Sequence, residues 1–282
     1  MRTLNECLIE SLLDDEDELV NDNTTLIEQF LNDNYIIKGT YTIKNGIVDV
    51  DGDVRISWDV HNDITGLTND IFEFGTINGD FIINDCINLK TLNGGPKRVK
   101  GDFLCSYCEK LESFEYAPKY VGQNLGADYC SNLKSLKGLP KKVESISLVA
   151  CKIITNLEHI PDANEYILDG CSNLKSLEGL PASHEYSLSV SNCKKLKSLK
   201  GCGRKIGYLD IIKCSLNSFK DGPEILSGNL YMDYTEIKSL DGFPKIIKGD
   251  INLYDATLPI SFDEFKNEFI PQNVKLSGDI TT

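Results

Sequence analysis

The stretch VESISLVACKIITNLEHIP, residues 143–161, contains one complete unit of the pattern that decides the fold. Ile146 and Leu148 are separated by a serine and lie five and three positions before Cys151. Apolar residues at every second position are the signal of a β-strand. After the cysteine, apolar residues continue at a spacing near three as far as Pro161. The stretch therefore predicts a short strand followed by an irregular return segment.

The same unit recurs along the chain, and a series of seven cysteines marks it. Successive cysteines are 20 to 22 residues apart, and a proline follows most of them after ten residues. We call this series the cysteine ladder: Cys86, Cys108, Cys130, Cys151, Cys171, Cys193 and Cys214. In the eighth unit we expect Tyr234 to replace the cysteine. One strand with a tight return cannot bury its own apolar side, so the units must stack on one another as a solenoid.

The ladder cysteines are predicted to be packing residues. A cysteine is small and carries a weak S–H donor, so it can fill the inward turn after each strand and bond a neighbouring carbonyl. Cys105 and Cys108 form a C-x-x-C pair, but no second pair or histidine cluster completes a zinc site, and we expect no metal. Asp49, Asp51 and Asp53 resemble a calcium loop with its glycine and glutamate misplaced, which favours an exposed acidic turn.

Residues 143–154 read L-x-x-L-x-L-x-x-C-x-x-L and so resemble the leucine-rich repeat, with cysteine where asparagine often stands. The following segment with Pro161 is similar to the short repeats of secreted bacterial effectors. This resemblance implies a curved solenoid with a parallel β-sheet on its concave face, irregular loop returns on its convex face, and a protein partner bound on the concave face. The segment LKSLKGLPKKV, residues 133–143, is also similar to repeat proteins of tailed phages.

The remaining segments are predicted to form ends. We expect an acidic helical head over residues 1–35, degenerate strands or a cap over 36–76, leucine-rich repeats over 77–256, and a C-terminal cap over 257–282. Within the head, helices are expected at 3–19 and 25–31. The strands of the second segment are expected to break at Gly39, Gly46 and Gly52. Ser261 and Glu264 have the spacing of a helix capping box, which places another short helix near the C-terminus.

Charge is unevenly divided along the chain. The formal net charge is −14, yet residues 1–80 contain 18 acidic and 4 basic residues while residues 81–282 contain 25 of each. An acidic segment repels nucleic acid and anionic lipid, so we expect neither as a partner and expect a basic protein surface instead. No apolar window of 18 residues and no secretory signal occur, which predicts a cytoplasmic protein, in the host cytoplasm or the virion if a phage encodes it.

No constellation of catalytic residues emerges from the sequence. His61, His159 and His184 fall in separate units, without a nucleophile that the repeat would expose. Glycine-rich phosphate-binding motifs do not occur. We therefore predict a protein that is not an enzyme and binds no cofactor.

Binding is expected at the outward positions of the strands, four and two residues before each ladder cysteine, and at neighbouring tyrosines. Lysine, arginine and histidine do not occur in that set between residues 82 and 212, whereas lysines such as Lys134 and Lys200 cluster on the return path. Tyr107, Tyr129, Tyr208, Tyr231 and Tyr254 are expected to form one stripe, and tyrosine is enriched at interfaces. The predicted partner-binding residues are Asn84, Ser106, Tyr107, Asp128, Tyr129, Val149, Asp169, Ser191, Asp210, Ile212 and Tyr231.

Two functions remain open at this point. The first is a protein-protein interaction module that acts as a phage or bacterial effector or inhibitor. The alternative is an internal or structural protein packaged in a phage capsid, with residues 1–12 as a targeting or processing peptide. The sequence does not fix the oligomeric state.

Overall fold

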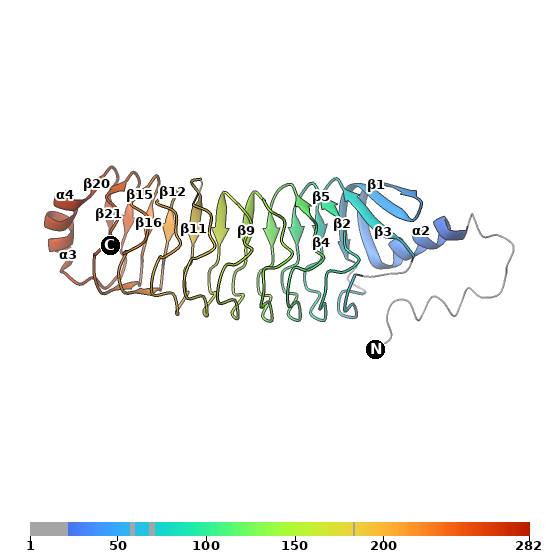
Figure 1. Cartoon of the computed structure of the whole chain (residues 1–282), viewed down its shortest axis with the longest axis horizontal. Coiled ribbons are helices and arrows are strands. Elements are labelled where there is room, and N and C mark those ends of the chain that lie inside the picture. Colours follow the sequence, from blue (N-terminus) through green and yellow to red (C-terminus); the bar gives the residue numbers. More distant parts are fainter. Residues whose placement is uncertain (1–21, 57–59, 68–70, 183) are drawn as a thin grey trace. The chain divides into compact units, whose positions relative to one another are not determined.

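The computed structural model describes residues 22–56, 60–67, 71–182 and 184–282. The chain forms two compact units, Met1–Glu144 and Ser145–Thr282, which we describe separately. The fold is a parallel β-solenoid with about nine turns, and in each unit successive strands lie side by side (Figure 1). The helix predicted at 3–19 and its acidic run lie outside the described residues.

The first unit begins with a helix and a β-hairpin. Helix α2 (Asp22–Asn34) leads directly into strand β1 (Tyr35–Lys44), which pairs antiparallel with β2 (Ile47–Ile56). The predicted breaks at Gly39 and Gly52 are wrong, because these glycines lie opposite each other inside the hairpin. A Cβ atom on Gly39 would lie 2.1 Å from the carbonyl oxygen of Asp51, so glycine permits this close approach. Only Asn45 and Gly46 make the turn, both at positive φ, as tight hairpins require.

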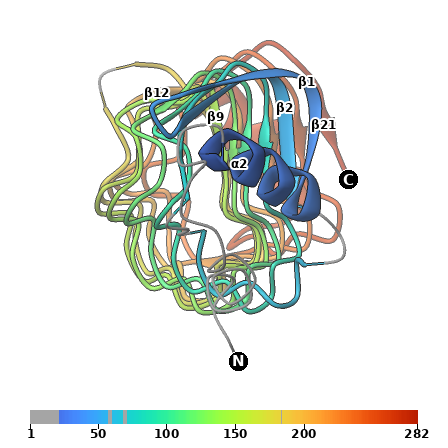
Figure 2. The same cartoon turned by 90° about the vertical axis from the view of Figure 1, so that its right-hand side faces the viewer.

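Helix α2 covers the apolar interior at the start of the first unit. Ile27, Phe30 and Leu31 are buried, and the ring of Phe30 meets that of Phe72 edge to face at 5.8 Å. Figure 2 shows α2 lying across the end of the first unit's coils. A terminal turn has no neighbouring turn beyond it, so the helix supplies the missing apolar partner.

Two parallel rows of strands follow the hairpin in the first unit. One row joins β2, β4, β6 and β8, and the other joins β2, β3, β5 and β7. The strands are β3 (Glu73–Ile77), β4 (Phe81–Ile82), β5 (Arg98–Val99), β6 (Phe103–Leu104), β7 (Tyr120–Val121) and β8 (Leu125–Gly126). Phe81 and Phe103 occupy equal positions of adjacent strands, and their rings stack in the core.

The second unit has a main sheet, a second sheet and a short strand pair. The main sheet contains β9 (Ser145–Ser147), β10 (Glu165–Ile167), β11 (Ser187–Ser189), β13 (Leu209–Asp210), β16 (Leu230–Tyr231), β19 (Ile251–Asn252) and β21 (Ile280–Thr281). The second sheet contains β12 (Lys205–Ile206), β15 (Ile225–Leu226), β18 (Ile246–Ile247) and β20 (Lys275–Leu276), and β14 (Ser215–Leu216) pairs with β17 (Glu236–Ile237).

A short helical segment lies near the end of the second unit. It consists of α3 (Phe262–Glu264), a π-helical turn η1 (Phe265–Phe269) and α4 (Ile270–Asn273). The hydroxyl of Ser261 caps α3 by accepting the backbone N–H of Glu264 at 3.2 Å. Phe265 is fully buried and packs edge to face on Phe243 at 5.6 Å, which fixes the segment to the last turns.

All seven ladder cysteines are buried, and the nine cysteines that the structure describes are free thiols. The Sγ atom of Cys108 donates to the carbonyl oxygen of Ile83 in the preceding turn at 3.2 Å. In the second unit Cys193 makes the equivalent bond to Leu168, also at 3.2 Å. This geometry confirms the packing role predicted for the ladder. Burial raises the pKa of the Cys214 thiol to about 11, so that thiol is protonated at neutral pH.

The ladder continues beyond the cysteines, but not through Tyr234. Thr235 is the buried residue in the eighth unit, and its hydroxyl donates to the carbonyl oxygen of Ile211 at 2.6 Å. Tyr234 lies one position earlier, exposed and at positive φ, where Tyr107 stands in the second ladder unit. The expected substitution at Tyr234 is therefore wrong by one residue, because the units differ in length and the spacing alone does not fix the register.

A second ladder of aspartates connects the turns at the start of the strands. Asp53 and Asp80 each accept the backbone N–H of the corresponding residue in the next turn, at 3.0 and 2.8 Å. Asp49, which was expected in an exposed acidic turn, lies in β2 and accepts the N–H of Thr76 at 2.6 Å. Asp49 and Asp51 are exposed as expected, but the expected turn is wrong, since Asp49, Asp51 and Asp53 lie in a strand. Asp49 and Asp53 satisfy backbone donors of the neighbouring turn.

Candidate protein-binding faces

Each unit exposes one face of its main strands, which we call the outward face. It consists of the residues six, four and two positions before each ladder residue, which alternate with buried core residues. Most of these side chains are half-buried and remain accessible between neighbours of the same row, but Ser189 and the predicted binding residue Ser191 are buried. The predicted partner-binding residues between Asn84 and Tyr231 lie on this face, apart from Tyr107 and Tyr129 at its border.

In the first unit the predicted residues are linked by short contacts. The backbone N–H of Ser106 donates to Asn84 Oδ1 at 2.8 Å, and that of Asp128 donates to Ser106 Oγ at 3.1 Å. The rings of Tyr107 and Tyr129 stack nearly parallel with centroids 4.7 Å apart, and 46% and 45% of their surfaces remain exposed. The stack follows from left-handed backbone at the same position of two successive turns. It forms a fixed aromatic surface beside the polar row.

A small hollow on the same face of the first unit joins the predicted residue Asn84 to residues that were not predicted to bind a partner. It has a volume of about 160 Å³ and is lined by Ile82, Leu104 and Asn84, together with Arg55 and His61. Arg55 pairs with Ile82 in register, so it is an outward residue of the preceding turn. The absence of basic residues from the outward positions between residues 82 and 212 therefore does not extend to the preceding turn. Sequence analysis missed Arg55 because the register of β2 with β4 is not visible in the spacing of the repeat.

In the second unit four predicted residues form one hydrogen-bonded group. Asp169 Oδ1 accepts the backbone N–H of Ser191 at 2.8 Å, and the Ser191 hydroxyl donates to Asp210. Asp210 also accepts the backbone N–H of Ile212 at 3.0 Å. Both carboxylates thus support the sheet as well as facing outward. Val149 lies half-buried at the position of Asp169 one turn earlier.

The predicted tyrosine stripe is wrong, because its members occupy different positions of the repeat. In the second unit Tyr208 lies edge to face with Tyr231 at 6.3 Å, and Tyr254 meets Tyr234 at 5.4 Å. Only the Tyr107 and Tyr129 rings are stacked in register. The faces therefore carry separate aromatic pairs rather than one continuous row.

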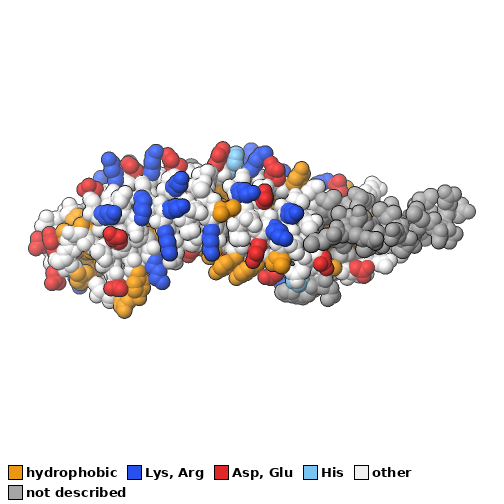
Figure 3. All heavy atoms as spheres, turned by 90° about the horizontal axis from the view of Figure 1, so that it is seen from below, with side chains coloured by type: hydrophobic (Ala, Val, Ile, Leu, Met, Phe, Trp, Pro, Cys, Tyr) orange, Lys and Arg blue, Asp and Glu red, His pale blue; other side chains and the backbone are white. Residues whose placement is uncertain are grey.

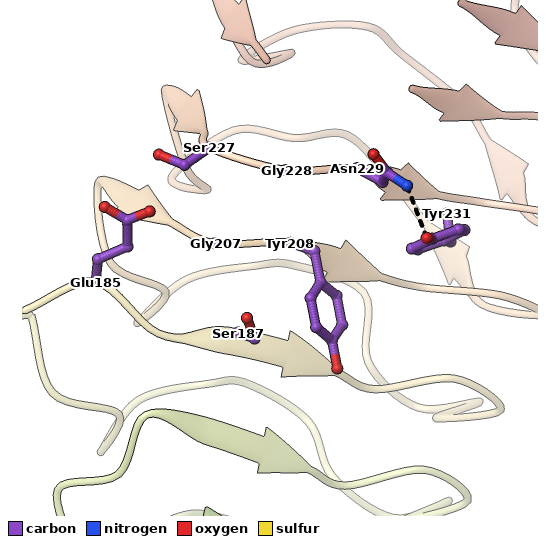
Figure 4. Close-up of a pocket in the computed structure, with 8 residues that line it drawn as sticks. All are labelled: Glu185, Ser187, Gly207, Tyr208, Ser227, Gly228, Asn229 and Tyr231. Carbon is purple, nitrogen blue, oxygen red and sulfur yellow. Dashed lines mark hydrogen bonds between the residues drawn. The ribbon is translucent and has the colours of Figure 1, made fainter. Parts of the chain in front are cut away.

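Tyr208 and Tyr231 border a larger hollow in the second unit (Figure 4). Its volume is about 430 Å³, and it is an open, shallow hollow rather than an enclosed cavity. Burial, together with a hydrogen bond to Glu165 Oε1 at 2.8 Å, raises the pKa of Tyr208 well above its ordinary value. The Tyr208 hydroxyl is therefore a neutral donor. Sequence reasoning placed Tyr231 here but missed Glu185, Ser187 and Ser227, which come from other turns.

The return path has a different character, because several of its lysines form ion pairs between turns. Lys137 lies 2.6 Å from Glu115 in the first unit, and Lys200 lies 2.7 Å from Glu178 in the second. Each lysine lowers the pKa of its partner carboxyl by hydrogen bonding and charge. Figure 3 shows a face on which Lys, Arg, Asp and Glu side chains lie next to one another. Within each pair the two charges compensate each other inside the protein.

The described part of the chain shows neither a metal-site cluster nor a helix that could cross a membrane. Among residues 22–56, 60–67, 71–182 and 184–282, no cluster of three or more His, Cys, Asp or Glu side chains has the arrangement of a metal site. None of the helices described in those ranges combines the length and apolar character that crossing a bilayer requires. No protein-family model, curated protein or solved structure matches this chain.

Proposed function

We propose that this protein is a non-enzymatic interaction module that binds a partner protein on the outward face of its strands. The observation that carries the proposal is the exposed Tyr107–Tyr129 stack beside the polar row of Asn84, Ser106 and Asp128. Tyrosines held in one rotamer lose little conformational entropy on binding and frequently dominate interface energies.

The outward face favours a partner with a basic surface. Asp128, Asp169 and Asp210 contribute negative charge, and the hydrogen-bond donors of Asp210 are neutral groups. A partner with exposed arginine or lysine would meet complementary potential there, with cation–π contacts to the tyrosine rings. Within the class of solenoids, we assign the protein to the leucine-rich-repeat type on its L-x-x-L-x-L-x-x-C pattern, with the sheet as the binding face.

The proposal can be tested with a photo-crosslinking amino acid placed at Tyr129 on the outward face. The matched control is the same amino acid at Tyr116, which is 59% exposed on the return path of the same unit. In the native cell, a protein crosslinked from position 129 and not from 116 is expected, and the purified partner should bind the unlabelled chain. Equal crosslinking from both positions, or failure of the purified partner to bind, would contradict the proposal.

The alternative of a capsid-packaged protein depends on residues 1–12, which lie outside the described residues. Mass spectrometry of purified virions would detect the chain, with or without its first residues, if that alternative were correct.

A further inference from the structure

The hollow in the second unit has a floor made of backbone. Gly207 and Gly228 lie side by side, with the N–H of Gly228 donating to the carbonyl oxygen of Gly207 at 2.7 Å. A Cβ atom on Gly207 would lie 2.7 Å from Ser187 Oγ. Absence of side chains at both glycines leaves space above the strands, and Figure 4 shows the other lining residues arranged around it.

One side of the hollow is an aromatic corner. The rings of Tyr208 and Tyr231 stand at 80° to each other, and both hydroxyls are engaged. Tyr208 donates to Glu165 at 2.8 Å, while Tyr231 accepts from Asn229 Nδ2 at 2.7 Å (Figure 4). Asn229 is itself fixed, because its Oδ1 accepts the backbone N–H of Asp250 at 2.9 Å. The rings are thus held in place before any ligand arrives, which reduces the entropy cost of binding.

The opposite side of the hollow is polar. Glu185 and Ser227 lie there, with Ser187 near the floor (Figure 4). Ser227 Oγ is buried and makes no hydrogen bond of ordinary geometry with the described residues. Its contact with the Glu185 carboxylate is poorly aligned, so a bound polar ligand would give this hydroxyl a better partner. Serine hydroxyls both donate and accept, while the carboxylate of Glu185 accepts.

The charge inside the hollow is balanced. Glu185 forms an ion pair with Lys205 at 2.5 Å, and Lys205, with a smaller contribution from Ser227, lowers the pKa of that carboxyl. The remaining lining side chains are hydroxyl, amide and phenol groups, which are neutral. Glu185 is the one charged residue among the described residues of the lining, so a charged ligand would have to displace its ion pair with Lys205 to find a counter-charge within the hollow. A neutral ligand with several hydroxyls would not.

We propose that this hollow is a binding site for a neutral saccharide. A sugar ring has hydroxyls around its edge and C–H groups on its faces, so one face can lie against Tyr208 or Tyr231 while the edge meets Ser187, Ser227 and Glu185. The site goes beyond the proposed protein-binding function and is independent of the Tyr107–Tyr129 stack, which lies in the first unit.

The test is binding of the purified full chain to an array of neutral and acidic glycans, followed by titration of the best neutral glycan. We expect neutral glycans to bind, and the Tyr208→Ala and Ser227→Ala variants to lose at least tenfold in affinity. Tyr234→Ala is the matched control, because Tyr234 is exposed in the same unit and does not line the hollow. Its affinity should equal that of the unmodified chain.

Ser227→Ala keeps the test informative if Tyr208→Ala fails to fold, since it removes a single oxygen atom whose contact with Glu185 is not a well-aligned hydrogen bond. The proposal is overturned if no glycan binds, if only acidic glycans bind, or if the folded variants bind as well as the control. A matched peptide array that binds through Tyr208 while the glycans do not would also overturn it. None of these outcomes bears on crosslinking from Tyr129, so the two proposals fail separately.

Discussion

The ladder inside the solenoid and the outward face of the same strands differ in how regular they are. Inside, the residue after each strand is a buried small donor bonded to the previous turn, whether it is Cys193 or Thr235. Outside, equivalent positions vary between apolar, small and charged residues such as Ile167, Ser189 and Asp210. The contrast teaches that strict repetition here marks packing, whereas binding should be sought where the repeat varies.

The largest effect that would test this contrast is the loss of stability at alkaline pH. Thiols of the unfolded chain ionise near pH 8.5, whereas burial raises the pKa of Cys214 to about 11 and raises that of Cys193 still further. The unfolded state therefore binds fewer protons between these values, so stability is complete below about pH 8 and falls as pH rises toward about 11. Urea unfolding at pH 7 and pH 9.5 measures the fall. Equal free energies of unfolding would show that the ladder thiols are not buried.

Removal of an inward side chain should have the next largest effect. Leu188 in β11 is fully buried, so Leu188→Ala should lower the free energy of unfolding by about 2–5 kcal/mol through lost burial and a residual cavity. The control is Ile167→Ala at a half-buried outward position of the adjacent strand, which should cost about 1 kcal/mol or less. Similar losses for the two variants, measured by urea unfolding, would mean that the assignment of faces is wrong.

The donor role of the ladder is tested by a pair of nearly isosteric substitutions. Cys214→Thr should be tolerated, because Thr235 already makes the same bond one turn later. Cys214→Val fills the same space without a donor and leaves the carbonyl oxygen of Val190 with only the backbone N–H of Cys193, so it should be less stable than the threonine variant by about 0.5–1.5 kcal/mol. If valine were as stable as threonine, the ladder would need only a small residue.

The smallest effect is expected on the return path. Lys137→Ala removes an exposed ion pair with Glu115, and water and salt screen such pairs. Its melting temperature should be indistinguishable from that of the unmodified chain. A clear decrease in physiological salt would indicate that the paired charges hold the turns together.

The sequence alone predicted the length of the repeat, the burial of the ladder cysteines and the alternation of inward and outward residues along each strand, because each of these depends on spacing within one unit. The sequence-based predictions failed where the position of a residue depends on how one turn aligns with the next. Thr235 was missed because units of unequal length shift the ladder by one residue. Gly39 and Gly52 were misread because glycine breaks strands as often as it permits the close approach of two of them.

The hollows could not be predicted for the same reason. Glu185 and Ser227 line one hollow although they are two turns apart along the chain, and Arg55 joins Ile82 only through strand pairing. A signal was present in Gly207 and Gly228, which precede strands at equal positions of successive turns. The sequence does not show that these two glycines lie side by side in adjacent turns, so it could not reveal the open space above them.

The central claim is that partner binding depends on the outward face, and the affinity of the crosslinked partner for two tyrosine variants tests it most directly. The double variant Tyr107→Ala and Tyr129→Ala should lose at least about tenfold in affinity, or about 1.4 kcal/mol, because it removes the stacked aromatic surface. The Tyr116→Ala variant removes a still more exposed ring from the return path and should bind like the unmodified chain. Loss of affinity in Tyr116→Ala with retention in the double variant would contradict the account.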